Sequence, residues 1–207
     1  MNKGVDMKVK WEDIAKYYGW DINEHKHELT TALNTTHAKI ACNWIDRFPK
    51  AYSSGEHAEA KLLNEEFWQK TVPSAMQASI GSGMQALVTL IINRSPCSSC
   101  CGKLVDALDT LKRKHPFVAE ENSFFLLAMR GKYKSTTDQD FASLVDAGWS
   151  LGTLEVNVEK YTDPKSKEGL SSAGIALQTA LTERKVFVDG HPQRIQNISG
   201  SYWALGH

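Results

Sequence analysis

The sequence has no long apolar run and no net charge of either sign. Its hydrophobic segments all fall short of the roughly 18 to 20 residues that a membrane-spanning helix needs, and its N-terminus carries no apolar stretch typical of a secretory signal. The 24 basic residues equal the 24 acidic residues in number, so no overall field attracts the chain to a polyanion. These absences favour a soluble, cytoplasmic protein with no membrane partner.

The chain also lacks any internal repeat, low-complexity tract or linker that would divide it. Its 207 residues are enough to bury one hydrophobic core. We therefore expect a single domain over residues 1–207, with a core at about 9–158. A C-terminal helix and a tail would occupy 159–207.

Cysteine is scarce, and its placement argues against a disulfide framework. Three of the four cysteines, Cys97, Cys100 and Cys101, lie within five residues of each other behind Pro96. In a reducing compartment such a cluster is more typical of metal binding. Cys101 points about 100 degrees away from its neighbour on a helix, so we expect it to pack rather than to bind metal. Cys42 lies in a predicted strand, and we interpret it as a small buried hydrophobic residue.

Hydrophobic periodicity predicts helices and strands that alternate over most of the chain. Segments with the helical period are 9–20, 57–72, 97–114, 138–147 and 170–184. Segments typical of strands are 28–33, 37–45, 86–92, 123–129 and 153–158. The first two strands would form a hairpin, whereas 46–56 and 73–85 carry loop residues. A short helical crossover at 138–147 predicts that the last two strands are parallel.

Two short motifs combine the residue types of a catalytic zinc site. His57 and Glu59 fall in the first turn of one predicted helix, and Cys97 and Cys100 open another at a C-x-x-C spacing. Each motif alone is ambiguous, since a single histidine is usually a structural polar residue and C-x-x-C can be redox-active. Together they supply three zinc ligands and leave a fourth position open for water. Glu59 is then free to act as a general base.

The motifs H-A-E at 57–59 and P-C-S-S-C at 96–100 resemble those of the cytidine deaminase-like superfamily. The resemblance implies a three-layer α/β/α fold with a five-stranded mixed sheet in which strands 4 and 5 are parallel. It also implies Zn²⁺ bound by His57, Cys97 and Cys100, with zinc-bound hydroxide as the nucleophile. Glu59 would be the proton shuttle in the hydrolytic conversion of cytosine to uracil.

Within that superfamily, the run S-P-C-S-S-C at 95–100 and the segment D-A-G-W at 146–149 resemble the AID/APOBEC branch and its bacterial toxin relatives. This resemblance implies single-stranded DNA or RNA as the substrate. For the toxin relatives it implies a larger secreted protein with an immunity protein as partner. The residues expected to bind substrate are Ser95, Pro96, Ala58, Asn43, Arg94 and Tyr133.

Charge near the cysteine motif leaves the substrate class open. Between residues 94 and 134 there are eight Lys or Arg and four Asp or Glu, and Tyr133 could stack a base of a single strand. The basic run 112–114 is equally typical of a solvated helix end. Zero net charge favours an alternative, a deaminase of free cytidine, deoxycytidine or another nucleobase. A second alternative is an inactive deaminase-like domain with a structural zinc.

Overall fold

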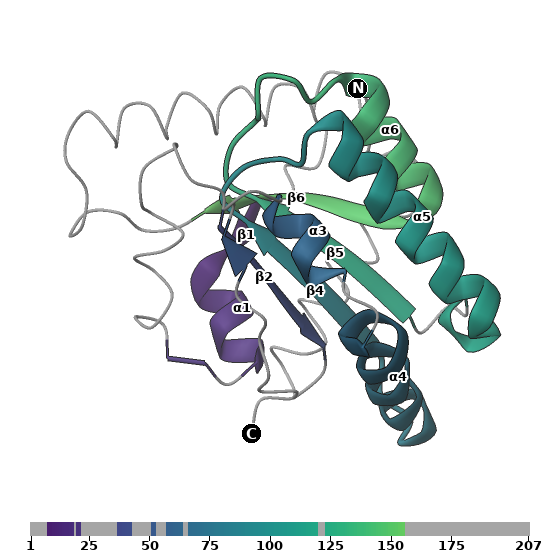
Figure 1. Ribbon diagram of the computed structural model, residues 1–207. Helices are drawn as coiled ribbons and strands as arrows, with labels where there is room; N and C mark the ends of the chain where they lie inside the picture. Colours follow the sequence, from purple (N-terminus) through teal and green to yellow (C-terminus); the bar gives the residue numbers. More distant parts are fainter. Residues whose placement is uncertain are drawn as a thin grey trace, which may run out of the picture.

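The protein, seen in a computed structural model, is an α/β protein built on one mixed sheet (Figure 1). The described residues are 8–18, 20–21, 37–42, 51–52, 57–63, 66–119 and 123–155. The strands are β1 (Lys8–Lys10), β2 (His37–Cys42), β3 (Ala51–Tyr52), β4 (Ala86–Ile92), β5 (Ser123–Met129) and β6 (Trp149–Glu155). The helices are α1 (Trp11–Tyr18), α3 (Ala58–Leu62), α4 (Val72–Gly81), α5 (Ser98–Lys114) and α6 (Asp138–Ala147), with a π-helical turn at Phe67–Thr71 and a 3₁₀ turn at Pro116–Ala119.

The sheet has the strand order β1-β6-β5-β4-β2-β3. Strands β4, β5, β6 and β1 run parallel to one another, and β2 is antiparallel to both β4 and β3. The predicted parallel pairing of the last two strands is confirmed in β5 and β6. Four of the five strands expected from the sequence lie among the described residues, and the short strands β1 and β3, which were not predicted, bring the described sheet to six strands. One predicted strand, 28–33, lies outside the described residues.

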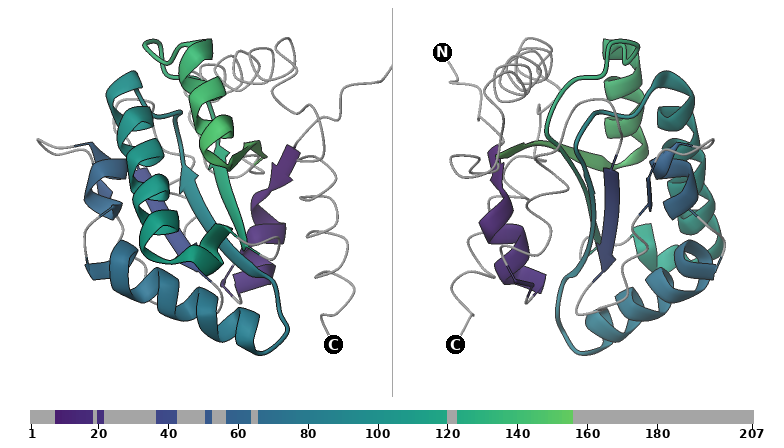
Figure 2. Two further views of the ribbon diagram at one scale, coloured as in Figure 1. Left: turned by 90° about the vertical axis from the view of Figure 1, so that its right-hand side faces the viewer. Right: turned by 60° about the vertical axis from the view of Figure 1, so that its left-hand side comes forward.

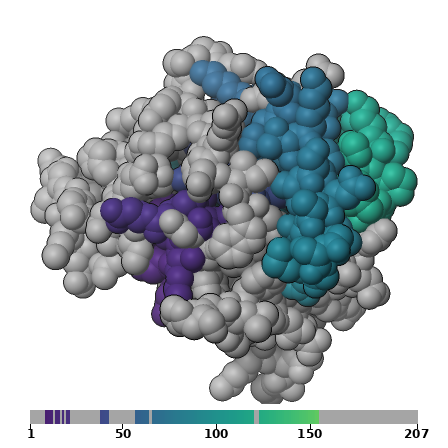
Figure 3. Space-filling model, turned by 90° about the horizontal axis from the view of Figure 1, so that it is seen from below, coloured from purple at the N-terminus to yellow at the C-terminus, as the bar shows by residue number. Residues whose placement is uncertain are grey.

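The central strand β4 is buried along its whole length, as its continuous apolar run predicts. Alternate side chains point to opposite faces of a strand. Val88 and Leu90 join a core formed with α3, α4, α5 and α6, whereas Leu87 and Ile91 join a second core formed with α1. Figure 2 shows the consequence, with α1 on one side of the sheet and α3, α4, α5 and α6 on the opposite side. Viewed from below, α1 and α4 occupy separate parts of the surface (Figure 3).

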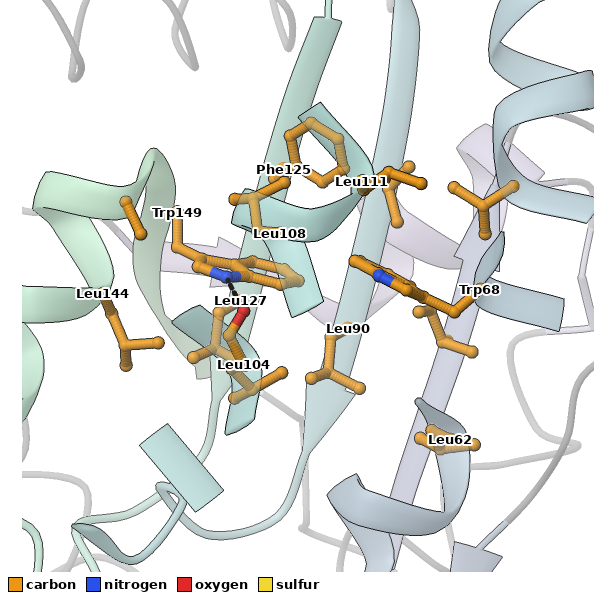
Figure 4. Close-up of a cluster of buried hydrophobic side chains, with 14 of the residues drawn as sticks. Leu62, Trp68, Leu90, Leu104, Leu108, Leu111, Phe125, Leu127, Leu144 and Trp149 are labelled. Atoms are coloured by element: carbon orange, nitrogen blue, oxygen red, sulfur yellow. Dashed lines mark hydrogen bonds between the residues drawn. The ribbon is translucent and has the colours of Figure 1, made fainter. Parts of the chain in front are cut away.

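The larger core is organised around two tryptophans that flank α5 (Figure 4). The rings of Trp68 and Trp149 stack with centroids 6.0 Å apart. Trp149 Nε1 donates a hydrogen bond to the Leu104 carbonyl at 3.2 Å, and Trp68 Nε1 donates to the Ala107 carbonyl at 3.0 Å. These bonds satisfy the polar edge of each buried indole. They also fix α5, and therefore its N-terminal cysteines, relative to the sheet.

The smaller core confirms the amphipathic character of the first predicted helix. Trp11, Ile14 and Tyr18 are buried against the sheet, and the Tyr18 hydroxyl donates to Thr89 Oγ1 at 2.9 Å. The predicted start at residue 9 is wrong, because Val9 pairs with Leu154 as part of β1. A pattern of side chains does not reveal such pairing, since the partner strand lies far along the chain.

The prediction of a loop at 73–85 is also wrong, because α4 covers most of it. Val72, Met76 and Ser79 are buried at helical spacing, and Pro73 lies in the first turn, where its missing N–H costs nothing. The serine and glutamine content suggested a loop. Here tertiary burial of one helix face prevails over weak helix propensity.

The segments described after α5, up to residue 155, agree closely with prediction except at one strand. The helix at 138–147 and its end at Gly148 are confirmed, and Gly148 adopts the left-handed conformation with φ 106°. The last strand begins at Trp149 rather than at residue 153, because Trp149 and Leu151 both enter the larger core.

Other predictions are tested only in part. The helix predicted for 57–72 is divided into α3 and the π-helical turn before α4. Residues 51–52 of the predicted loop at 46–56 form β3. The predicted helix 170–184 lies outside the described residues. Among the described residues, no helix combines the length and the apolar character needed to cross a membrane.

Replacing Gly148 by alanine is expected to destabilise the protein by about 1 to 2 kcal/mol, the cost of a left-handed non-glycine residue. The new methyl group would also meet the Lys112 side chain, whose Nζ lies 2.6 Å from the ideal Cβ position. Gly102 in α5 is the matched control, because nothing lies within 4 Å of its ideal Cβ. Gly102→Ala should stabilise by about 0.5 to 1 kcal/mol. Urea unfolding of both variants measures the difference, and equal effects would contradict the conformational argument.

Candidate metal centre

His57, Cys97 and Cys100 come together as a group that could hold a metal ion. His57 Nδ1 lies 3.3 Å from Cys97 Sγ and 3.2 Å from Cys100 Sγ, and all three ligand atoms lie within 4.8 Å of one another. The group forms between residues separated by 40 and 43 positions in the chain. The sequence prediction that these three side chains converge is therefore confirmed.

Two helix starts position the ligands. His57 precedes α3 with an extended backbone (φ −67°, ψ 141°), and Cys97 precedes α5 in the same way (φ −70°, ψ 165°). Cys100 lies one turn into α5 and is 3% exposed. Cys100 thus lies within a helix that packs on the sheet, and His57 and Cys97 each directly precede such a helix.

The environment of Cys100 keeps its thiol protonated when no metal is present. Burial, together with the nearby Glu59 carboxylate, raises the pKa of Cys100 above its ordinary value. The helix N-terminus favours a thiolate, but burial prevails here. Metal binding at this group must therefore displace protons and weaken as the pH falls.

Glu59 lies beside the ligands and is almost fully buried, with 3% exposure. Among the described residues, its Oε2 atom has no hydrogen-bond partner. Burial raises the pKa of Glu59, and its own backbone amide, His57 and Cys100 offset part of that rise. An unpaired buried oxygen is costly unless something else binds it. Glu59 is therefore a group with a free acceptor atom and an increased affinity for a proton.

Three predicted substrate residues, Ser95, Ala58 and Pro96, are buried in the chain itself. Ser95 is 2% exposed, and its hydroxyl group lies 2.8 Å from Thr136 Oγ1 and accepts the Tyr133 amide at 2.8 Å. Ala58 is fully buried in the larger core. Pro96 is buried as well, and its carbonyl accepts the Thr136 hydroxyl at 2.6 Å.

Two other predicted substrate residues remain partly accessible and contact each other. Arg94 Cζ lies 5.8 Å from the centroid of the Tyr133 ring, a cation–π geometry. Both side chains are half-buried. The last member of the predicted set, Asn43, lies outside the described residues.

The remaining cysteines do not belong to the ligand group. Cys42 and Cys101 are buried, and their thiols donate to the carbonyls of Val72 at 3.9 Å and Pro96 at 3.6 Å. Burial raises the pKa of each thiol to about 12. Both therefore stay neutral at physiological pH, which confirms the packing role predicted for them.

Fewer basic side chains lie near Cys97 in the structure than their positions in the sequence suggest. The basic run Lys112 to Lys114 ends α5, whose 17 residues place it about 25 Å from Cys97. Arg130 is 7% exposed, and burial lowers its pKa to about 10. Lys132 forms an ion pair with Asp138 at 3.6 Å. Half of the eight basic residues counted between 94 and 134 thus lie at the far end of α5 or in the interior.

Sequence reasoning missed the polar contacts that join the starts of α5 and α6. Ser98 Oγ lies 2.8 Å from Asp140 Oδ2 and 3.0 Å from the Ser135 carbonyl oxygen, and its single proton can be donated to either acceptor. Asp140 also forms a capping box with Thr137. The T-x-x-D spacing is the sequence signal that could have revealed the cap. Nothing in the sequence indicates the contact with Ser98.

Replacement of Cys100 by alanine is expected to abolish tight metal binding, whereas Cys101→Ala should retain about one equivalent. The reason is that Cys100 contributes a ligand atom and Cys101 does not. Elemental analysis of purified protein, together with competition against a chromogenic chelator, measures the difference. Equal metal content in the two variants would show that the group does not hold the ion.

Comparison of the chain with models of protein families and with curated proteins gave no match. The chemical interpretation of the centre therefore depends on the geometry of its residues and on the two short motifs that contain them.

Proposed function

We propose that this chain is a zinc-dependent hydrolytic deaminase that converts cytosine to uracil in single-stranded DNA or RNA. The observation that carries the proposal is the placement of Glu59. Its carboxyl group is buried, one of its oxygens has no hydrogen-bond partner among the described residues, and it adjoins a group of three residues that could hold a metal ion and leave a fourth position open. A group that can move a proton beside an open metal position is the arrangement required for metal-assisted hydrolysis.

Zinc is the ion that suits this donor set best. Tetrahedral zinc separates nitrogen and sulfur ligands by about 3.6 Å, given Zn–N near 2.05 Å and Zn–S near 2.3 Å. The nitrogen to sulfur distances of 3.3 and 3.2 Å are close to that value. One imidazole and two thiolates favour zinc over the hard ions magnesium and calcium, which prefer oxygen.

Glu59 would do the proton transfer in the reaction. Zinc, when bound, lowers the pKa of water at its open position and so supplies a nucleophile near neutral pH. Glu59 would accept one proton from the attacking water and pass it to the ring nitrogen as the water oxygen bonds to the ring carbon. It would then take the second proton from the new hydroxyl group and pass it to the amino group, whose bond to that carbon breaks as ammonia leaves. Cytosine and water then give uracil and ammonia. A carboxyl group whose pKa is raised by burial is suited to hold a proton between these steps.

The arrangement of elements supports a three-layer, cytidine deaminase-like fold for this enzyme. His57 and Glu59 lie at the start of α3, and the P-C-x-x-C motif lies at the start of α5 after the central strand. Helices cover both faces of a sheet whose strands β4, β5 and β6 are parallel. This is the combination that the motif resemblance implies.

Arg94 and Tyr133 support a polynucleotide substrate. An aromatic ring held against a guanidinium group is a common platform for stacking the bases of a single strand. Arg94 lies three residues before Cys97, so the arginine of this pair and Cys97 lie on the same connection after β4.

A second candidate, a deaminase of free nucleosides, is favoured by the distribution of charge. The run Lys112 to Lys114 is remote from the ligands, and Lys132 is paired with Asp138. A long polyanion would find less positive charge beside the centre than the sequence suggests. The two candidates share the reaction and differ in what surrounds the base.

Glu59→Gln is expected to keep zinc and to lose roughly 100- to 10,000-fold in turnover, the usual contribution of general acid–base catalysis. Ammonia release from cytidine, deoxycytidine and a cytosine-containing oligonucleotide measures activity, and elemental analysis measures zinc. Glu66→Gln is the control, since Glu66 is exposed and the charge change is the same. Comparable activity in Glu59→Gln would refute the mechanism. Zinc-loaded wild type that deaminates none of the substrates would favour a structural role for the metal.

Tyr133→Ala is expected to raise KM for the oligonucleotide by roughly 5- to 100-fold, because stacking on one aromatic ring contributes about 1 to 3 kcal/mol. Tyr133→Phe keeps the ring and should stay close to wild type. Steady-state kinetics on single-stranded DNA, single-stranded RNA and free nucleosides measure the effect. Turnover of nucleosides alone would overturn the polynucleotide substrate and favour the second candidate.

A further inference from the structure

The connections after β4 and β5 lie side by side along one edge of the sheet (Figures 1 and 2). Backbone bonds continue the strand pairing beyond the strands themselves. Arg130 donates to the Ile92 carbonyl at 3.0 Å, and Ser95 donates to the Gly131 carbonyl at 2.7 Å. The connection that carries Cys97 is therefore joined to the one that carries Tyr133.

Beyond these backbone hydrogen bonds, the side-chain hydroxyls of Ser95 and Thr136 also link the two connections. Tyr133 N–H donates to Ser95 Oγ at 2.8 Å, Ser95 and Thr136 share a bond of 2.8 Å, and Thr136 Oγ1 donates to the Pro96 carbonyl at 2.6 Å. An amide can only donate and a carbonyl can only accept. Since each hydroxyl has one proton, Ser95 must be the donor to Thr136. The chain thus runs in one direction, from the Tyr133 amide to the Pro96 carbonyl.

Both hydroxyls are shielded from solvent, with Ser95 2% and Thr136 3% exposed. Water cannot readily replace either partner if one hydroxyl is removed. A buried donor or acceptor left without a partner costs more than the bond itself contributes. The chain of hydroxyls therefore fixes the connections in one arrangement rather than merely adding one contact.

The two ends of this chain reach different parts of the proposed active site. The Pro96 carbonyl belongs to the residue before the ligand Cys97 and also accepts the Cys101 thiol at 3.6 Å. The Tyr133 amide belongs to the residue whose ring contacts Arg94. Any shift of the second connection relative to the first changes the distance between the stacking pair and the metal ligands.

We propose that Ser95 and Thr136 are positioning residues, which hold the Arg94 and Tyr133 pair at a fixed place relative to Cys97. The proposal rests on the proposed function for its kinetic consequence, and it changes the role of Ser95 from substrate contact to internal support. Thr136 gains a role that the sequence motifs do not assign. Neither side chain touches the reacting atoms in this assignment.

The test is Thr136→Val, which keeps the shape of the side chain and removes the hydroxyl. It leaves the Ser95 hydroxyl without an acceptor and the Pro96 carbonyl without that donor. Amide hydrogen exchange of the segment 130–137 should become roughly three- to tenfold faster, the effect of losing one hydrogen bond. KM for the oligonucleotide should rise by a similar factor, while kcat and zinc content stay within about twofold of wild type.

Two further variants make the result specific. Thr136→Ser restores the hydroxyl and should return both exchange and KM close to wild-type values. Thr89→Val removes another buried threonine hydroxyl, the acceptor of Tyr18 on the opposite face of the sheet. It should lower general stability without changing exchange at 130–137 or KM.

The hydrogen-exchange measurement decides the positioning role even if the protein deaminates nothing, because exchange requires no substrate. Unchanged exchange at 130–137 in Thr136→Val would overturn the proposal. So would the same response in Thr89→Val, or failure of Thr136→Ser to restore the wild-type pattern. Faster exchange with unchanged KM in an active enzyme would overturn the link between this support and substrate binding.

Discussion

The parallel pairing of β4 with β5 is the constraint on which the candidate site depends. Ala86–Ile92 pairs along its whole length with Ser123–Met129. Parallel strands end at the same edge of a sheet, so this register brings the two following connections together. One connection carries the cysteine ligands and the other carries Tyr133. Hydrogen bonds between the two connections then hold them in place beyond the ends of the strands.

Helix packing does the rest of the positioning. The buried indoles of Trp68 and Trp149 donate to carbonyls of α5 and so determine where its first turn lies. Antiparallel pairing of β2 with β4 places α3 on the same face, with Ala58 and Leu62 in the core. His57 reaches the cysteines because two rigid helices approach each other. The carboxyl group of Glu59 is buried in the same place, where its charged form is costly and its pKa is raised.

The sequence predicted those features that depend on local pattern. The apolar runs of β4 and β5 and the periodicity of α5 were sufficient to assign them, and the group that could hold a metal ion was predicted from residue type and spacing. The strands β1 and β3 could not be predicted, because two or three residues carry no period and their pairing comes from distant partners.

The role of Ser95 was not predictable for a related reason. Its partner Thr136 is 41 positions away, and hydroxyl groups give no sign in sequence of whether they face substrate or the interior. The run Lys112 to Lys114 suggested positive charge near Cys97. It lies at the opposite end of the 17-residue helix α5, far from Cys97. The short motifs thus predicted which three side chains converge, His57, Cys97 and Cys100, but not the contacts of the residues around them.

The separation of the ligands along the chain gives the metal a second consequence. An ion held by His57 and Cys97 would close a loop of 40 residues, as a covalent cross-link between the same positions would. Closure of such a loop restricts the unfolded chain by about 4 kcal/mol in the chain-entropy treatment of cross-links. The same ion would then serve as an internal staple between α3 and α5, so that loss of metal and loosening of the helical face would occur together.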